Sequence, residues 1–161
     1  MRRAVFAAAF AAFFLLNAVS LHATDLDATG GWTNLVIDSS YLQGGAGTDL
    51  QDSYTSGEGA TTLNVTGTSG SDDAWKVQVR MDNTSWQSGV ILSVQRKGNG
   101  SGAGSISNGT SYTAVGTSDV YFFEGTGDRT DIPVQYEISG MSISMPPGTY
   151  STTLTFTVVD I

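Results

Sequence analysis

The fold is decided by residues 75–81, which read Trp-Lys-Val-Gln-Val-Arg-Met. Apolar and polar residues alternate along this stretch, and successive side chains of a β-strand point to opposite faces. A strand here would bury its apolar side chains against a second layer and leave Lys76 and Arg80 in solvent. This stretch therefore predicts a half-buried strand in a layered β-protein.

The same period of two residues recurs on both sides of this stretch. It is found at residues 63–65, 90–94, 132–138 and 154–158, with a candidate first strand at 35–37 and a more apolar segment at 120–124. Stretches rich in Gly, Asn, Asp and Pro separate these segments and reverse the chain. Apolar residues do not recur at helical spacing over three turns anywhere after residue 24. We therefore predict an all-β fold, an immunoglobulin-like antiparallel β-sandwich of seven or eight strands.

Residues 1–23 have the layout of a secretory signal peptide. Arg2 and Arg3 form a positive start, an apolar run over 4–16 follows, and small residues up to Ala23 provide cleavage sites. The run is shorter than the roughly 20 residues of a membrane-spanning helix, and no second apolar stretch of that length follows. We predict export, cleavage, and one domain over 24–161, located in the periplasm, at the cell surface or outside the cell.

The residue types that are missing exclude most catalytic chemistry. The chain has no cysteine, and its one histidine, His22, lies in the segment predicted to be removed. A thiol nucleophile, a Ser-His-Asp triad and a His/Cys zinc site are therefore excluded. Two routes to catalysis remain: a carboxylate pair, as in glycoside hydrolysis, and a serine with a lysine base. The second is disfavoured, because the positions of Lys76 and Lys97 predict exposed side chains without a lowered pKa. We predict that the protein is not an enzyme and uses no cofactor or metal.

The charge balance limits the partners. The net charge is −8, and removal of Arg2 and Arg3 would make the chain more acidic. Such a surface repels phosphate backbones and anionic membranes, so we expect no nucleic-acid partner. The acidic turns at 72–73 and 128–131 lack the spacing of a calcium loop and are interpreted as solvated, although the sequence leaves a bound calcium open.

The most specific stretch closes the chain. A Pro-Pro-Gly turn ends at Gly148, and an alternating segment follows it. The apolar positions of this segment are Tyr150, Leu154, Phe156 and Val158. This pattern resembles the closing strand of bacterial chaperone–usher pilus subunits and of spore-coat-U-like secreted domains, although Asp160 stands where those families usually have an aromatic residue.

That resemblance implies an incomplete sandwich whose missing strand is supplied by another protein. The partners would be other subunits or a periplasmic chaperone, and pairing would occur by β-augmentation. Gly148, Tyr150, Leu154, Phe156 and Val158 would then be the assembly residues. We expect an exported structural subunit of a pilus, fimbria or surface coat.

The sequence leaves a second class of function open. A complete secreted sandwich could bind a ligand such as a carbohydrate by stacking sugar rings on exposed aromatic side chains. Trp32, Trp86 and Tyr112 are the candidates, because each is next to Gly, Asn, Ser or Thr at a predicted strand end. The glycine-rich residues 98–111 are interpreted as a flexible loop rather than a domain linker, because neither side of them has enough strands to close its own core. They do not form a phosphate loop, since no helix follows them.

Overall fold

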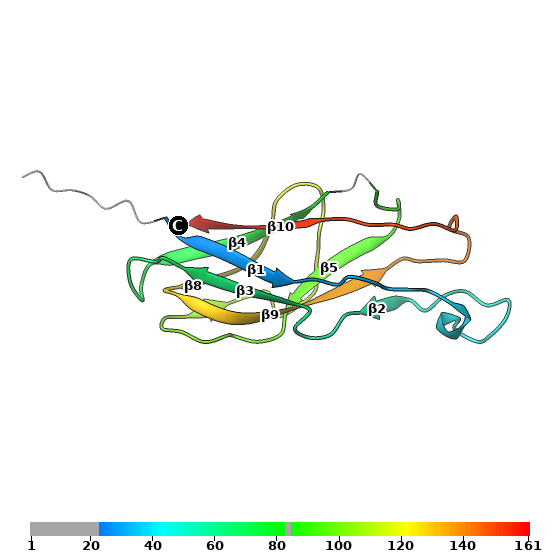
Figure 1. Cartoon of the computed structure of the whole chain (residues 1–161), viewed down its shortest axis with the longest axis horizontal. Coiled ribbons are helices and arrows are strands. Elements are labelled where there is room, and N and C mark those ends of the chain that lie inside the picture. The colour runs from blue at the N-terminus through cyan, green and yellow to red at the C-terminus, as the bar shows by residue number, and fades with distance from the viewer. Residues whose placement is uncertain (1–22, 83–84) are drawn as a thin grey trace, which may run out of the picture.

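The computed structural model describes residues 23–82 and 85–161, so the predicted signal peptide lies outside the described residues apart from Ala23. The described chain forms two antiparallel sheets with one hydrophobic core between them (Figure 1). It contains one short 3₁₀ turn, η1 (Ser39–Tyr41), and no α-helix. The prediction of an all-β sandwich is confirmed.

No helix of the described residues is both long enough and apolar enough to serve as a membrane span.

The first sheet has the strand order β1-β3-β9-β5-β7, and β2 pairs with the C-terminal end of β9. Its strands are β1 (Asp25–Gly30), β2 (Ser53–Thr55), β3 (Thr61–Thr66), β5 (Ile91–Arg96), β7 (Thr113–Ala114) and β9 (Arg129–Ser139). The second sheet has the order β10-β4-β8-β6. Its strands are β4 (Ala74–Met81), β6 (Ile106–Ser107), β8 (Val120–Thr126) and β10 (Leu154–Asp160). The described residues thus form ten strands rather than the predicted seven or eight. Three of the ten are very short: β2 has three residues, and β6 and β7 have two each.

The core forms where the alternating segments meet. Trp75, Val77 and Val79 of β4 are fully buried, as the two-residue period predicts. The Trp75 ring packs edge-on against Phe123 of β8, with centroids 5.9 Å apart, and its Nε1 donates to the Gly127 carbonyl oxygen at 2.8 Å. The indole thus fills the space between the sheets while its polar atom is satisfied.

The glycine-rich segment is not the free loop that its composition indicates. Three of its alternate glycines lie directly against backbone carbonyls of the hairpin formed by β8 and β9. An added Cβ at Gly100, Gly102 and Gly104 would lie 2.2 Å from the carbonyl oxygens of Thr130, Asp128 and Thr126, respectively. All three also have positive φ angles. Glycine is required here because any side chain would push the segment off the sandwich.

Two strand boundaries differ from the sequence-based expectation. Residues 35 and 37 lie outside the strands, and the first strand is β1 instead. The closing strand begins at Leu154, so Gly148 and Tyr150 precede it. The alternation at 35–37 is too short to distinguish a strand from an extended connection, and pairing partners decide the difference.

Candidate functional site

The two long sides of the sandwich are built differently. On one side the chain crosses from the second sheet to the first, forming β6 on β8 and then β7 on β5, each with only two residues. On the other side lie β1 and β10, with six and seven residues. Within the described chain, neither pairs with a strand on its outer edge. Two unpaired edges of this length expose rows of backbone N–H and C=O groups.

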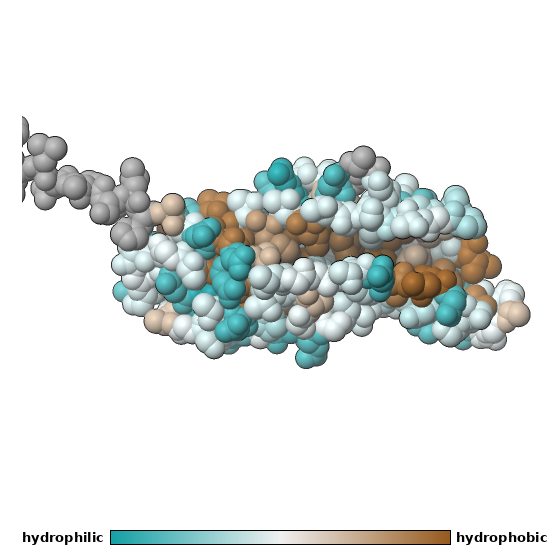
Figure 2. All heavy atoms as spheres, viewed as in Figure 1, coloured by the Kyte–Doolittle hydropathy of each residue, from teal (hydrophilic) through white to brown (hydrophobic). Residues whose placement is uncertain are grey.

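A groove lies between these two edges. β1 begins beside the end of β10, and the two strands then draw apart along the molecule (Figure 1). The space between them and their extensions has a volume of about 1190 Å³. Its walls include Ala28 of β1 and Phe156 of β10, and its floor includes Leu92 and Ile138 of the first sheet. Figure 2 shows the apolar residues of this groove exposed between two paler rims. We call it the seam groove.

The inward side chains of β10 are only partly buried, unlike those of its neighbour. Phe156 lies opposite Val79, and Val158 lies opposite Val77. Both valines of β4 are fully buried, whereas Phe156 and Val158 remain partly accessible. Residues directly opposite each other on paired strands point to the same face. The apolar stripe of β10 therefore points into the core but lacks a cover on its open side.

The wide end of the seam groove is formed by two segments without regular pairing, residues 31–52 and 140–153. Asp49 connects them: its carboxylate accepts hydrogen bonds from the amide of Ile143 at 3.0 Å and the hydroxyl of Ser142 at 3.2 Å. Hydrogen bonds from the Ile143 and Leu50 amides hold the pKa of Asp49 below its usual value. Val36 and Ile143 at this end are 74% and 58% exposed, so the rim is apolar as well.

Four of the five predicted assembly residues line this one groove: Gly148, Tyr150, Leu154 and Phe156. The fifth, Val158, packs against the core near the narrow end. Tyr150 lies outside the strand and donates from its hydroxyl to the Pro146 carbonyl oxygen at 2.6 Å. The structure therefore brings the predicted residues together, but along a strand and the connection before it.

The three aromatic candidates do not form one cluster, because two of them lie in the seam groove and the third lies elsewhere. Trp32 and Trp86 both line the seam groove and pack against the core. The Trp86 Nε1 donates to the Val90 carbonyl oxygen at 2.9 Å, which fixes its ring. Tyr112 lies elsewhere, with its hydroxyl donating to Gln135 at 3.0 Å, and burial raises its pKa. All three are half-buried rather than fully exposed.

The sequence reasoning missed the other wall of the groove. Leu26 and Ala28 alternate with Asp25 and Asp27, which is the period of a half-buried strand. The signal was present, but two apolar residues are a weak pattern. β1 pairs with β3 in regular register from Asp25 to Gly30, which makes it the edge of the first sheet.

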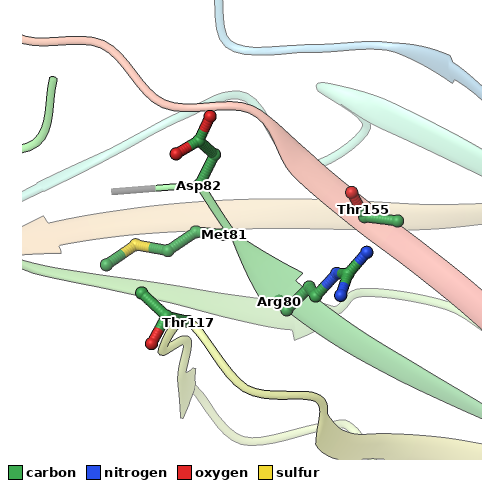
Figure 3. A pocket seen from close by; sticks show the side chains of 5 residues that line it. All are labelled: Arg80, Met81, Asp82, Thr117 and Thr155. Carbon is green, nitrogen blue, oxygen red and sulfur yellow. The ribbon is translucent and has the colours of Figure 1, made fainter. Parts of the chain in front are cut away.

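A second, smaller cavity of about 290 Å³ lies over Arg80, Met81 and Asp82 of the β4 end, with Thr117 and Thr155 beside them (Figure 3). The Arg80 Nε lies 3.8 Å from the Asp119 carboxylate, so its charge is already paired. No three His, Cys, Asp or Glu side chains are grouped as metal ligands within the described residues. The seam groove is therefore the larger and more apolar candidate site.

Comparison with known proteins adds no relative: no family model, no curated protein and no solved structure matches the chain.

Proposed function

We propose that the protein is an exported assembly subunit that accepts a β-strand from another protein into its seam groove. The observation that carries the proposal is the pair of unpaired edges, β1 and β10, on either side of an apolar groove. A strand placed there would pair with backbone groups that the described chain leaves open and would cover the apolar stripe of β10. Such an edge beside an open core otherwise promotes aggregation.

The nature of the assembly follows from the sequence pattern. The alternating segment after Gly148 resembles the closing strand of pilus subunits and spore-coat-U-like domains. In this chain that segment contains β10. An immunoglobulin-like sandwich that lacks one strand would take it from a neighbouring subunit or a periplasmic chaperone. The product would be a fibre or coat at the cell surface.

Hydrogen exchange tests this proposal. The purified protein is mixed with a synthetic peptide as long as β10, with Val or Leu alternating with Ser or Thr. We expect slower exchange at amides on the outer edges of β1 and β10, and no change in the central strands β4 and β9. Protection spread over the loops, or none, would contradict strand addition.

A matched pair of variants on β10 sharpens the test. Phe156→Ser removes an inward side chain, whereas Thr157→Ser changes the next residue, which is exposed and points outward. We expect the first variant to bind the peptide about tenfold more weakly and the second to keep its affinity, because the inward Phe156 ring supplies the apolar surface that an incoming strand would cover.

Carbohydrate binding is a second candidate, favoured by the fact that Trp32 and Trp86 share the same groove. Two indole rings in one groove can stack on successive sugar rings. Titration with oligosaccharides, followed by tryptophan fluorescence, tests this function. A change in emission that Trp86→Phe preserves and Trp86→Ala abolishes would support it, and a flat titration would remove it.

A further inference from the structure

We propose, building on strand acceptance as the function, that Met141 and Met145 form an oxidation site that regulates the seam groove. Peroxide would convert their thioether sulfurs to sulfoxides, and the groove would then accept an apolar strand much more weakly. A thiol-dependent reductase would restore both the thioethers and the affinity. The site is thus a reversible switch for assembly that responds to oxidants in the surroundings of the exported protein.

Sulfur atoms are few in this chain, and they gather at the groove. The chain has four methionines and no cysteine, and Met1 falls in the predicted signal peptide. Of the other three, Met141 and Met145 both line the seam groove. The third, Met81, lines the smaller cavity instead, and Figure 3 shows its thioether there. Because the chain has no thiols, oxidation at sulfur falls on these thioethers.

Backbone contacts hold both methionines at the wall of the groove. Gly140, which directly precedes Met141, has a φ angle of 77°, and an added Cβ there would lie 2.6 Å from a backbone carbonyl oxygen. Met145 closes a turn, with its amide donating to the Ser142 carbonyl oxygen at 3.0 Å. The Asp49 carboxylate accepts a hydrogen bond from the Ser142 hydroxyl and so ties this turn to the opposite wall. The two side chains therefore extend from a fixed part of the groove.

The environment of these side chains separates a switch from oxidative damage. Met141 and Met145 are both partly exposed, so peroxide in solution can reach them. Met81 packs against the hydrophobic core, whereas Met141 and Met145 are outside the set of described residues that do. A polar group can therefore be added at Met141 and Met145 without disturbing the core.

The oxidation requires only the thioether and a peroxide. The sulfur attacks one oxygen of hydrogen peroxide, the S–O bond forms as the O–O bond breaks, and the other oxygen leaves as water. The sulfur is oxidised and the peroxide is reduced. In the reverse step, a reductase removes the sulfoxide oxygen as water while thiols are oxidised to a disulfide.

The sulfoxide oxygen would change what the groove can bind. This oxygen is a hydrogen-bond acceptor, and water satisfies it in the free protein because both side chains are partly exposed. An apolar side chain of an incoming strand would displace that water without supplying a donor, and a buried acceptor without a donor is unfavourable. We expect strand binding to weaken about tenfold for each sulfoxide that the strand covers.

Peptide binding before and after oxidation tests the switch. The purified protein is treated with hydrogen peroxide, the sulfoxides are located by mass spectrometry, and the affinity for the alternating peptide is measured by fluorescence anisotropy. Met81→Leu keeps both groove methionines, and its affinity should fall by about tenfold to a hundredfold on oxidation. Treatment with methionine sulfoxide reductases and a thiol should restore it.

The matched control is the double variant Met141→Leu with Met145→Leu. Leucine has nearly the volume of methionine and cannot form a sulfoxide, so this variant should bind the peptide equally well before and after peroxide. The urea midpoint of Met81→Leu should be the same before and after oxidation, because its two remaining thioethers in the described chain lie outside the core.

The outcomes separate the two proposals. Equal binding before and after oxidation, or no sulfoxide at either groove position, would overturn the switch and leave strand acceptance intact. An equal loss of affinity in the double variant would assign the effect to other oxidised side chains, such as Trp32 or Trp86, and would overturn it as well. So would a urea midpoint that falls together with the affinity, since the fold itself would then be damaged. Failure of the unoxidised protein to bind the peptide would refute strand acceptance, and the switch with it.

Discussion

Replacing Phe156 by alanine should affect strand binding and the stability of the free protein to different extents. The ring packs 6.2 Å from the Phe122 ring, centroid to centroid, and is partly buried. Phe122 is 1% exposed, so an alanine there should cost the full value for a core phenylalanine, about 3–5 kcal/mol. Phe156→Ala should cost the free protein less, about 2 kcal/mol, because water already reaches part of the ring.

The part of the ring that is still in water sets the effect on binding. On the order of 50 Å² of the ring would become buried under an added strand, which at about 25 cal/mol per Å² corresponds to about 1.3 kcal/mol. Phe156→Ala should therefore weaken binding of an alternating peptide about tenfold. Urea unfolding measures the loss of stability, and fluorescence anisotropy of a labelled peptide measures the loss of affinity.

Thr157→Ala is the control for both measurements. The Thr157 side chain is exposed on the outer face of the same strand. The free energy of unfolding of this variant should therefore change by less than about 0.5 kcal/mol, and its affinity for the peptide should not change. The reasoning would be refuted if Phe156→Ala bound the peptide as tightly as the unaltered protein. It would also be refuted if Phe156→Ala destabilised the free protein as much as Phe122→Ala, because the groove would then already be closed.

Gly125→Ala should lower the melting temperature by about 5–10 °C, since its Cβ would lie 2.7 Å from the Trp75 ring and overpacking costs about 1–3 kcal/mol. Gly116→Ala meets no atom within 4 Å and should melt close to the unaltered protein; equal melting of both variants would contradict the tight packing. Hydrogen bonds lower the pKa of Asp49 from 3.8, so the stability they supply is present above pH 3.8 and is lost as the pH falls through the lowered pKa. The protection factor of the Ile143 amide, taken against the intrinsic exchange rate at each pH, should fall across that acid range, whereas in Asp49→Asn it should be low and independent of pH there.

Much of the sandwich could be predicted from local patterns. The alternation at 75–81 and 132–138 reports directly on which side chains face the core, because the period of a strand is fixed at two residues. The strands β4 and β9 and their buried residues follow from it. The composition also anticipated the turns, although the glycines at 100, 102 and 104 are required by close contact with a neighbouring turn rather than by freedom of motion.

The candidate site could be predicted only in part. The alternation predicts that Leu154 and Phe156 point inward, and both line the seam groove. Tyr150 was placed on the strand, but it lies in the connection that precedes it. Alternation marks inward positions, yet it does not show where pairing with a partner begins, and for β10 that is set by the length of β4.

The order of residues along the chain thus specified strands, turns and an apolar stripe on each strand, because these depend on neighbours within a few positions. Which strands would become the edges of the two sheets depended on contacts between residues far apart in the chain. β1 and β10 stand at opposite ends of the described sequence, and only the folded chain brings them together on either side of one groove. An unpaired edge is a property of the whole sheet, so no single segment can encode it.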